Sequence, residues 1–154
     1  MAKMINKDPL ASKLNSDTYL GFDFGNKKIG IAIGQSTTSI ASPLKTIRSI
    51  NQQPNWELIS QLVKEWNPAG LIVGISKQGD GSDNPITPRM YKFCRQLEGR
   101  YNLPVYQIDE SFSTFEAKQM LFDDLKVNAE KLWDVQDQLA AQLILQSWLN
   151  LKAS

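Results

Sequence analysis

Acidic residues stand at three places in this sequence where a carboxylate could bind a metal ion instead of facing solvent. Asp23 lies inside an apolar segment, between two phenylalanines, and Asp109 and Glu110 close a second apolar segment. Asp137 lies at helical spacing from apolar residues around it. Carboxylates are the ligands that hard cations such as Mg²⁺ and Mn²⁺ prefer. Because ions held in this way activate water and stabilise a leaving oxygen, the acids predict hydrolysis at phosphorus.

The composition excludes several other chemistries. The 154 residues include no histidine and one cysteine, Cys94. Without an imidazole there is no Ser-His-Asp or Cys-His site, and zinc sites built on His or several Cys cannot form within one chain. A disulfide framework is excluded for the same reason, and the apolar neighbours of Cys94 predict a core position.

The length and the 42% hydrophobic content fit one soluble domain. We expect residues 1–17 to be a flexible N-terminal lead-in and residues 18–152 to form that single domain. No signal peptide pattern and no run of about 18 apolar residues is present. These features predict a cytoplasmic protein with no membrane partner.

The first part of the chain predicts a hairpin that carries Asp23. The β-branched segments predict strands over 18–24, 29–34 and, after Pro43, a short one over 44–47. Gly25 opens the first turn, since glycine adopts the backbone conformations that tight turns need. Asp23 would then face away from both neighbouring phenylalanines. Taken alone, it fits a solvated sheet face equally well.

After residue 50 the pattern alternates between helical and strand periods. The expected elements are a helix over 56–66 capped by Asn55, a strand over 71–75, a helix capped by Thr87 and ended by Gly99, a strand over 104–109, a helix opened by a capping box at 113–116, an irregular stretch over 128–133 and a helix from about 134 to 151. Three antiparallel strands followed by parallel strands predict an α/β mixed five-stranded sheet flanked by helices on both sides. This is the element order of the ribonuclease H-like fold.

The other acids also have two interpretations each. Asp109 and Glu110 end a parallel strand, at the sheet edge where ligands bind in α/β proteins. Adjacent strand residues point to opposite faces, so we expect only one of the two to face the site. Either acid, and Asp137 as well, could instead interact with a helix dipole.

Four segments in order resemble the YqgF family of pre-16S rRNA nucleases, which are related to Holliday junction resolvases. The matching segments are 22–35, 72–75 with 80–82, 109–117, and Asp137 with Ala140 and Ala141. The resemblance implies a ribonuclease H-like fold and a cytoplasmic bacterial nuclease that uses Mg²⁺ or Mn²⁺. It also implies processing of the 5′ end of pre-16S rRNA during ribosome biogenesis. Its implied catalytic residues are Asp23, Glu110 and Asp137, with Asp109 beside them as a fourth candidate metal ligand.

Two departures from the family pattern leave alternatives open. Ser111 stands where the family usually has Arg, and Ser76 where it usually has Pro. Losing the Arg removes a phosphate or carboxylate partner. One alternative is an endonuclease acting on branched DNA, which calls for a dimer. Another is an rRNA-binding assembly factor with little catalysis. The expected oligomeric state is a monomer or a weak homodimer.

Basic residues near the acids could bind a nucleic-acid backbone. The net charge is only +1, so the distribution of the charges carries more information than their sum. The candidates are Lys27, Lys28, Lys77, Arg89 and Lys92. Tyr91 and Phe112 could stack on bases. The simpler interpretation of the basic helix residues is a solvated face.

Overall fold

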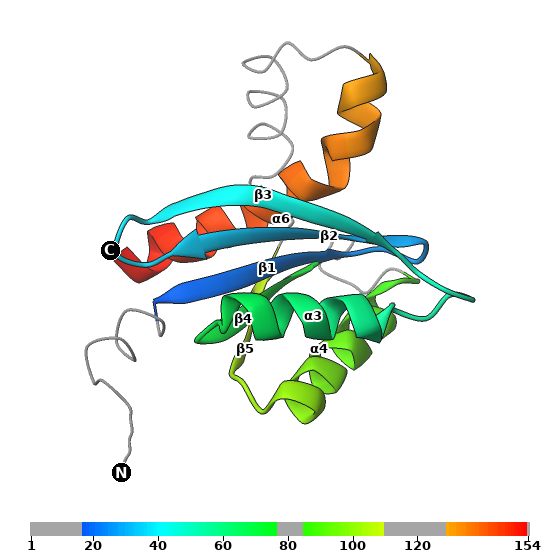
Figure 1. Cartoon of the computed structure of the whole chain (residues 1–154), viewed down its shortest axis with the longest axis horizontal. Helices are drawn as coiled ribbons and strands as arrows, with labels where there is room; N and C mark the ends of the chain where they lie inside the picture. Colours follow the sequence, from blue (N-terminus) through cyan, green and yellow to red (C-terminus); the bar gives the residue numbers. More distant parts are fainter. Residues whose placement is uncertain (1–16, 77–84, 110–128, 154) are drawn as a thin grey trace.

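Five strands form one mixed sheet with helices on both faces (Figure 1). The computed structural model describes residues 17–76, 85–109 and 129–153. The elements are β1 Thr18–Phe24, β2 Lys28–Gln35, β3 Ile40–Arg48, α3 Trp56–Trp66, β4 Gly70–Ile75, α4 Thr87–Tyr101, β5 Val105–Asp109 and α6 Ala129–Ala153. The sheet order is β3-β2-β1-β4-β5, in which β1, β2 and β3 are antiparallel and β1, β4 and β5 are parallel. The predicted mixed sheet is therefore confirmed.

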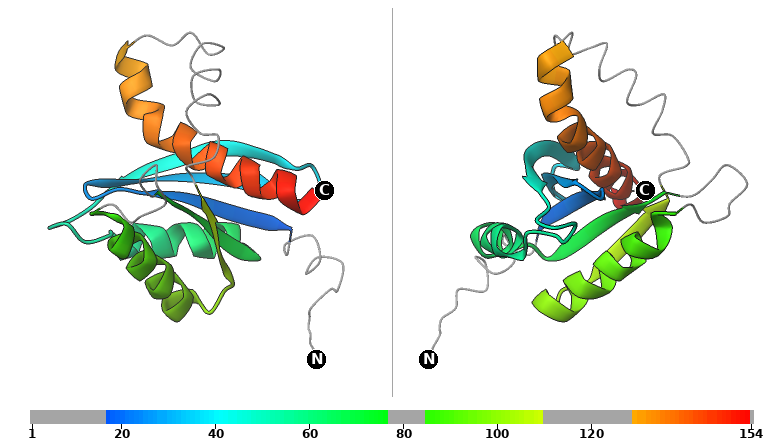
Figure 2. Two further views of the ribbon diagram at one scale, coloured as in Figure 1. Left: turned by 180° about the vertical axis from the view of Figure 1, so that it is seen from behind. Right: turned by 90° about the vertical axis from the view of Figure 1, so that its right-hand side faces the viewer.

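The sheet separates two hydrophobic cores. Leu20 and Phe22 of β1 are fully buried on the side that α3 and α4 cover, where Phe93 packs against them. Ile144 and Leu145 of α6 are buried against the opposite face. Figure 2 shows α6 on one side of the sheet and α3 and α4 on the other. All six residues of β4 are buried, as its unbroken apolar run predicts.

Strand β3 is longer than the sequence predicts, because it continues through Pro43 to Ile40. Proline lacks the N–H that a central strand needs, but an edge strand tolerates it. β3 lies at the edge of the sheet, and its pairing with β2 shifts register between Ile31 and Ala32, next to the Ala32–Pro43 pair. The edge position and this irregularity accommodate the proline.

Both predicted ends of α4 are wrong. Thr87 is not the cap: Ile86 precedes the helix without a side-chain hydrogen bond, and the Thr87 hydroxyl donates to the carbonyl of Ser76 at 2.8 Å. Thr87 therefore joins α4 to the end of β4. The helix also passes through Gly99 and ends at Tyr101, where the C-cap residue Asn102 adopts the left-handed conformation (φ 53°). Asparagine tolerates this conformation because its side chain can hydrogen-bond locally.

Two other helix boundaries test the sequence prediction. Asn55 caps α3 as expected, accepting a hydrogen bond from the Leu58 amide at 3.3 Å. The irregular stretch predicted over 128–133 is wrong, because α6 already begins at Ala129; the segment after Ala129 contains Glu, Lys and Leu, which favour helix. The capping box at 113–116 lies outside the described residues. Within those residues, no helix is long and apolar enough to cross a bilayer.

Candidate functional site

Asp23 lies on the sheet face that α6 covers. Leu20, Phe22 and Phe24 pack into the opposite core, and side chains alternate along a strand. Gly21, two residues before Asp23, approaches Leu145 of α6: a β-carbon added there would lie 2.7 Å from that side chain. Asp23 shares this face and is partly exposed.

Asp137 of α6 lies against Gly30 of β2, on the same face of the sheet as Asp23. Asp23 pairs directly with Gly30 across β1 and β2. A β-carbon added to Gly30 would lie 2.0 Å from the carbonyl oxygen of Asp137, so the helix backbone occupies the space where a side chain would be. The first strand and the last helix thus bring Asp23 and Asp137 to neighbouring positions on one face.

Lys28 neutralises Asp137. Its Nζ lies 3.0 Å from Oδ2 of Asp137, and both side chains are partly exposed, at 28% and 20%. That Oδ2 atom is itself buried, and within the described part of the chain it accepts no hydrogen bond. The Asp137 Oδ2 atom is therefore the ion-pair partner of Lys28, and it retains lone pairs that could bind a metal cation.

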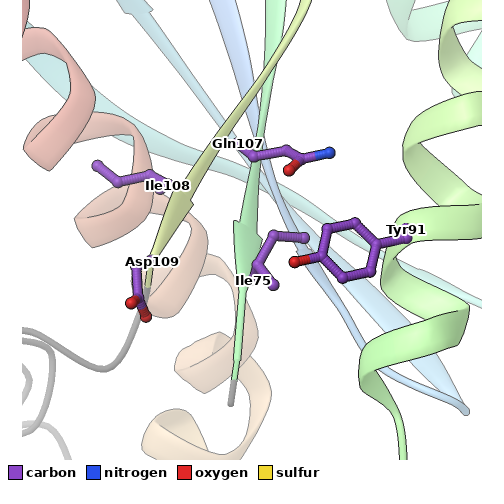
Figure 3. A pocket seen from close by; sticks show the side chains of 5 residues that line it. All are labelled: Ile75, Tyr91, Gln107, Ile108 and Asp109. Atoms are coloured by element: carbon purple, nitrogen blue, oxygen red, sulfur yellow. The ribbon is translucent and has the colours of Figure 1, made fainter. Parts of the chain in front are cut away.

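The end of β5 presents Asp109 to the other face. The ring of Tyr106 lies 5.0 Å from that of Trp148 in α6, in a tilted arrangement, and Ile108 packs in the α6 core, whereas Gln107 hydrogen-bonds Cys94 of α4. Figure 3 shows Gln107 on the α4 side of the strand and Ile108 on the other. By the same alternation, Asp109 belongs with Gln107 and away from Asp23.

The described residues contain no cluster of three carboxylate or thiol side chains that could hold a metal ion. Two of the four predicted ligands, Asp23 and Asp137, come together, and Asp109 lies on the opposite face. Glu110 is outside the described residues. The buried Oδ2 of Asp137, beside a second carboxylate, is the observation that fits a divalent cation at this place.

The predicted nucleic-acid contacts have different environments. Lys27 and Lys92 are exposed, on the β1–β2 turn and on α4. Arg89 is partly buried. Its guanidinium donates to Oδ1 of Asn26 and, at 2.8 Å, to the carbonyl of Gln52. Lys28 forms the ion pair with Asp137, and Lys77 lies outside the described residues.

Sequence reasoning missed Arg48. This exposed residue pairs directly with Lys28 across β2 and β3. Like charges placed opposite each other in a sheet repel. The Lys28–Arg48 pair therefore favours a nearby anion, and the carboxylate of Asp137 is such an anion. Arg48 is brought beside Lys28 by the register of β3, and the sequence patterns predict no register for that strand.

The chain is similar in sequence to a family and to named bacterial proteins. The family model of RuvX, described as Holliday junction resolvase, matches residues 17–151. A protein of Methylococcus capsulatus named "Putative pre-16S rRNA nuclease" is 51% identical over 89% of this chain and 91% of its own. A protein of the same name from Haemophilus ducreyi is 44% identical over 86% of this chain and 96% of its own.

Two solved structures share the fold at low sequence identity. RuvC of Thermus thermophilus, in complex with a Holliday junction substrate, has a TM-score of 0.55 at 14% identity, over 88% of this chain and 95% of that one. The Fowlpox virus resolvase, bound to junction DNA, has a TM-score of 0.51 at 18% identity, over 89% of this chain and 99% of that one. These likenesses support the ribonuclease H-like fold.

Proposed function

The chain belongs to the RuvX family, and from that membership we propose that it is a metal-dependent nuclease that hydrolyses phosphodiester bonds at the 5′ end of pre-16S rRNA. As an enzyme it is a hydrolase. The relatives' shared name supports the RNA substrate. A ribosomal RNA precursor as substrate favours a cytoplasmic location.

The observation that carries this proposal is that Asp23 and Asp137 lie on the same sheet face, because Gly30 is the strand partner of Asp23 and contacts the backbone of Asp137. Placing two carboxylates together is costly unless a cation neutralises them. Lys28 neutralises part of this charge. The remaining acceptor capacity supports a divalent ion, and we propose Mg²⁺ or Mn²⁺ because the candidate ligands are all carboxylate oxygens.

We assign the third carboxylate to Glu110 and not to Asp109. Along β5 the α6 face belongs to Tyr106 and Ile108. Glu110 follows Ile108 by two residues in the sequence, which is the spacing at which strand side chains return to one face. The proposed catalytic and metal-binding set is therefore Asp23, Glu110 and Asp137.

Each part of this set has a definite task. A divalent ion bound there would lower the pKa of a water molecule and neutralise charge on the phosphate. The carboxylates of Asp23 and Asp137 would bind the ion on the α6 face of the sheet, and Lys28 balances part of the charge of Asp137. Lys27, Arg48 and Lys92 are exposed cations that can contact neighbouring phosphates.

A second candidate function is resolution of branched DNA. It is favoured by the description of the family model and by the junction DNA bound to the two structural neighbours. Cutting a symmetric junction requires two sites and hence a dimer, whereas a monomer or weak homodimer suffices for cleaving rRNA. Sedimentation velocity in the presence of a four-way junction tests whether a dimer forms.

The direct test is cleavage of a pre-16S rRNA 5′-leader fragment and of a synthetic four-way junction, each in Mg²⁺, Mn²⁺ or EDTA. We expect metal-dependent cleavage of the RNA, with loss of activity in Asp23→Asn and Asp137→Asn. Glu57→Gln, a charge change in the first turn of α3, is the matched control. RNA binding without cleavage in any metal would instead support an assembly factor.

A further inference from the structure

A cavity of about 200 Å³ lies at the ends of β4 and β5, beside α4. Its lining combines the apolar Ile75 and Ile108, the ring of Tyr91 from α4, and the polar groups of Gln107 and Asp109 (Figure 3). Drug-sized ligands occupy cavities of roughly 300–1,000 Å³. This smaller volume suits a single flat ring system.

The cavity lies at the same edge of the sheet as the acidic site. It lies at the carboxyl ends of β4 and β5, and Asp23 lies near the carboxyl end of the parallel β1. Only β4 separates β1 from β5, so two strand spacings, about 10 Å in total, lie between them. A short single-stranded segment crossing this edge can reach the acids with a phosphate and the cavity with a base.

The lining groups match the requirements of an unpaired base. Single-stranded RNA is recognised by stacking on aromatic side chains and by hydrogen bonds to the base edges. Tyr91 supplies the ring, and buried Ile75 supplies an apolar wall. Gln107 is an exposed amide beside Cys94, and it offers both donor and acceptor groups.

We propose that this cavity binds one unpaired guanine of the nucleic acid that the enzyme cleaves. The proposal rests on the proposed nuclease function. An ionised carboxylate such as Asp109 only accepts hydrogen bonds, and guanine presents two adjacent N–H donors on its pairing edge. Adenine, cytosine and uracil each place an acceptor among their donors there. Asp109 is then a specificity residue and Glu110 the metal ligand.

The test is binding of short oligouridylates that carry one central guanosine, adenosine or cytidine, followed by fluorescence anisotropy in EDTA. We expect the guanosine oligomer to bind on the order of tenfold more tightly, which is the range of a two-bond base contact. Asp109→Asn should abolish this preference, because an amide N–H would then meet a donor. Glu98→Gln, an equal charge change on an exposed part of α4, should keep it.

Substitutions of Tyr91 provide a second test in the same binding experiment. Tyr91→Leu should weaken binding of every oligomer to a similar extent, roughly tenfold, because stacking is insensitive to sequence, and Tyr91→Phe should restore it. Circular dichroism confirms that the variants fold. Equal affinity of the parent protein for all three oligomers, or a preference unchanged in Asp109→Asn, would overturn the proposal.

Mn²⁺ titration of the same variants separates this proposal from the proposed function. If Asp109→Asn loses Mn²⁺ affinity and keeps its base preference, Asp109 is a metal ligand and the cavity assignment is wrong. If the parent protein shows the guanine preference and cleaves no RNA in any metal, the cavity assignment holds and the nuclease function fails.

Discussion

The carbonyl oxygen of Asp137 occupies the space beside Gly30 that a side chain at that position would fill. This contact sets the depth at which α6 packs on β2. It also sets the separation between the carboxylate of Asp137 and that of Asp23, which is the strand partner of Gly30. A glycine outside the acidic site therefore determines the geometry of that site.

We expect Gly30→Ala to lower both stability and metal affinity. The added carbon would stand 2.0 Å from a backbone atom, so α6 must move, at a cost of at least about 1–3 kcal/mol. Urea denaturation and Mn²⁺ titration measure the two effects.

Gly99→Ala is the matched control, because a β-carbon at Gly99 in α4 would meet nothing within 4 Å. That variant should be more stable than the parent protein by about 0.5–1 kcal/mol, since alanine favours helix over glycine. Equal stability of the two variants would show that α6 tolerates a side chain at residue 30.

Replacement of Lys28 should increase affinity for a divalent ion. The ammonium group of Lys28 lies 3.0 Å from the Asp137 oxygen and competes with a metal ion for it. Partly exposed ion pairs are worth up to about 1 kcal/mol, so Lys28→Gln should bind Mn²⁺ up to about fivefold more tightly by calorimetry. Lys27→Gln, an exposed neighbour, is the control. Weaker binding by Lys28→Gln would indicate that Lys28 chiefly orients Asp137.

The sequence identifies Asp23 and Asp137 because each carboxylate interrupts an apolar pattern within its own element. Such patterns are local, and the burial of Ala141 and Ile144 confirms the apolar stripe beside Asp137. The ion pair with Lys28 could not be predicted in this way. It depends on how α6 packs across β2, a contact between segments far apart in the chain.

Arg89 and Lys92 should behave differently although both were predicted to bind nucleic acid. Arg89 ties α4 to the loops at Asn26 and Gln52, so Arg89→Ala should cost about 1–2 kcal/mol of stability through lost charged hydrogen bonds. Thermal or urea unfolding measures this loss.

Lys92→Ala should leave stability unchanged, because the side chain is exposed. If it contacts a phosphate, the slope of log affinity against log salt should fall by about 0.7 for single-stranded RNA. An unchanged slope would remove Lys92 from the binding surface.

Stability should fall at alkaline pH because of Cys94. Burial raises the pKa of this thiol to about 11, against a partly opposing hydrogen bond from Gln107. A free cysteine ionises near pH 8.5, so above that pH the unfolded chain loses its thiol proton while the folded protein keeps it. Folding is then disfavoured, by at most about 1.4 kcal/mol per pH unit until the folded pKa is reached.

The measurement is the urea midpoint of the parent protein and of Cys94→Ala between pH 8 and 10.5. Other groups titrate equally in both proteins, so the difference in slope isolates the thiol. Parallel slopes would show that the thiol ionises equally in both states.

The boundaries that the sequence missed also depend on distant contacts. Thr87 has the residue type of a helix cap, but its hydroxyl bonds the carbonyl of Ser76 at the end of β4. Pro43 has the residue type of a strand breaker, but β3 is an edge strand. In both cases tertiary position overrides the local preference of the residue.

The two neighbouring acids come from opposite ends of the fold, with Asp23 in the first strand and Asp137 in the last helix. During translation the N-terminal strands emerge first, and they hold Asp23 without its partner until α6 has been made and has packed. A partly synthesised chain therefore carries an incomplete acidic site. Hydrolytic capability, on this arrangement, requires that α6 be present and packed, and proteolytic loss of α6 would remove it together with the hydrophobic core on that face of the sheet.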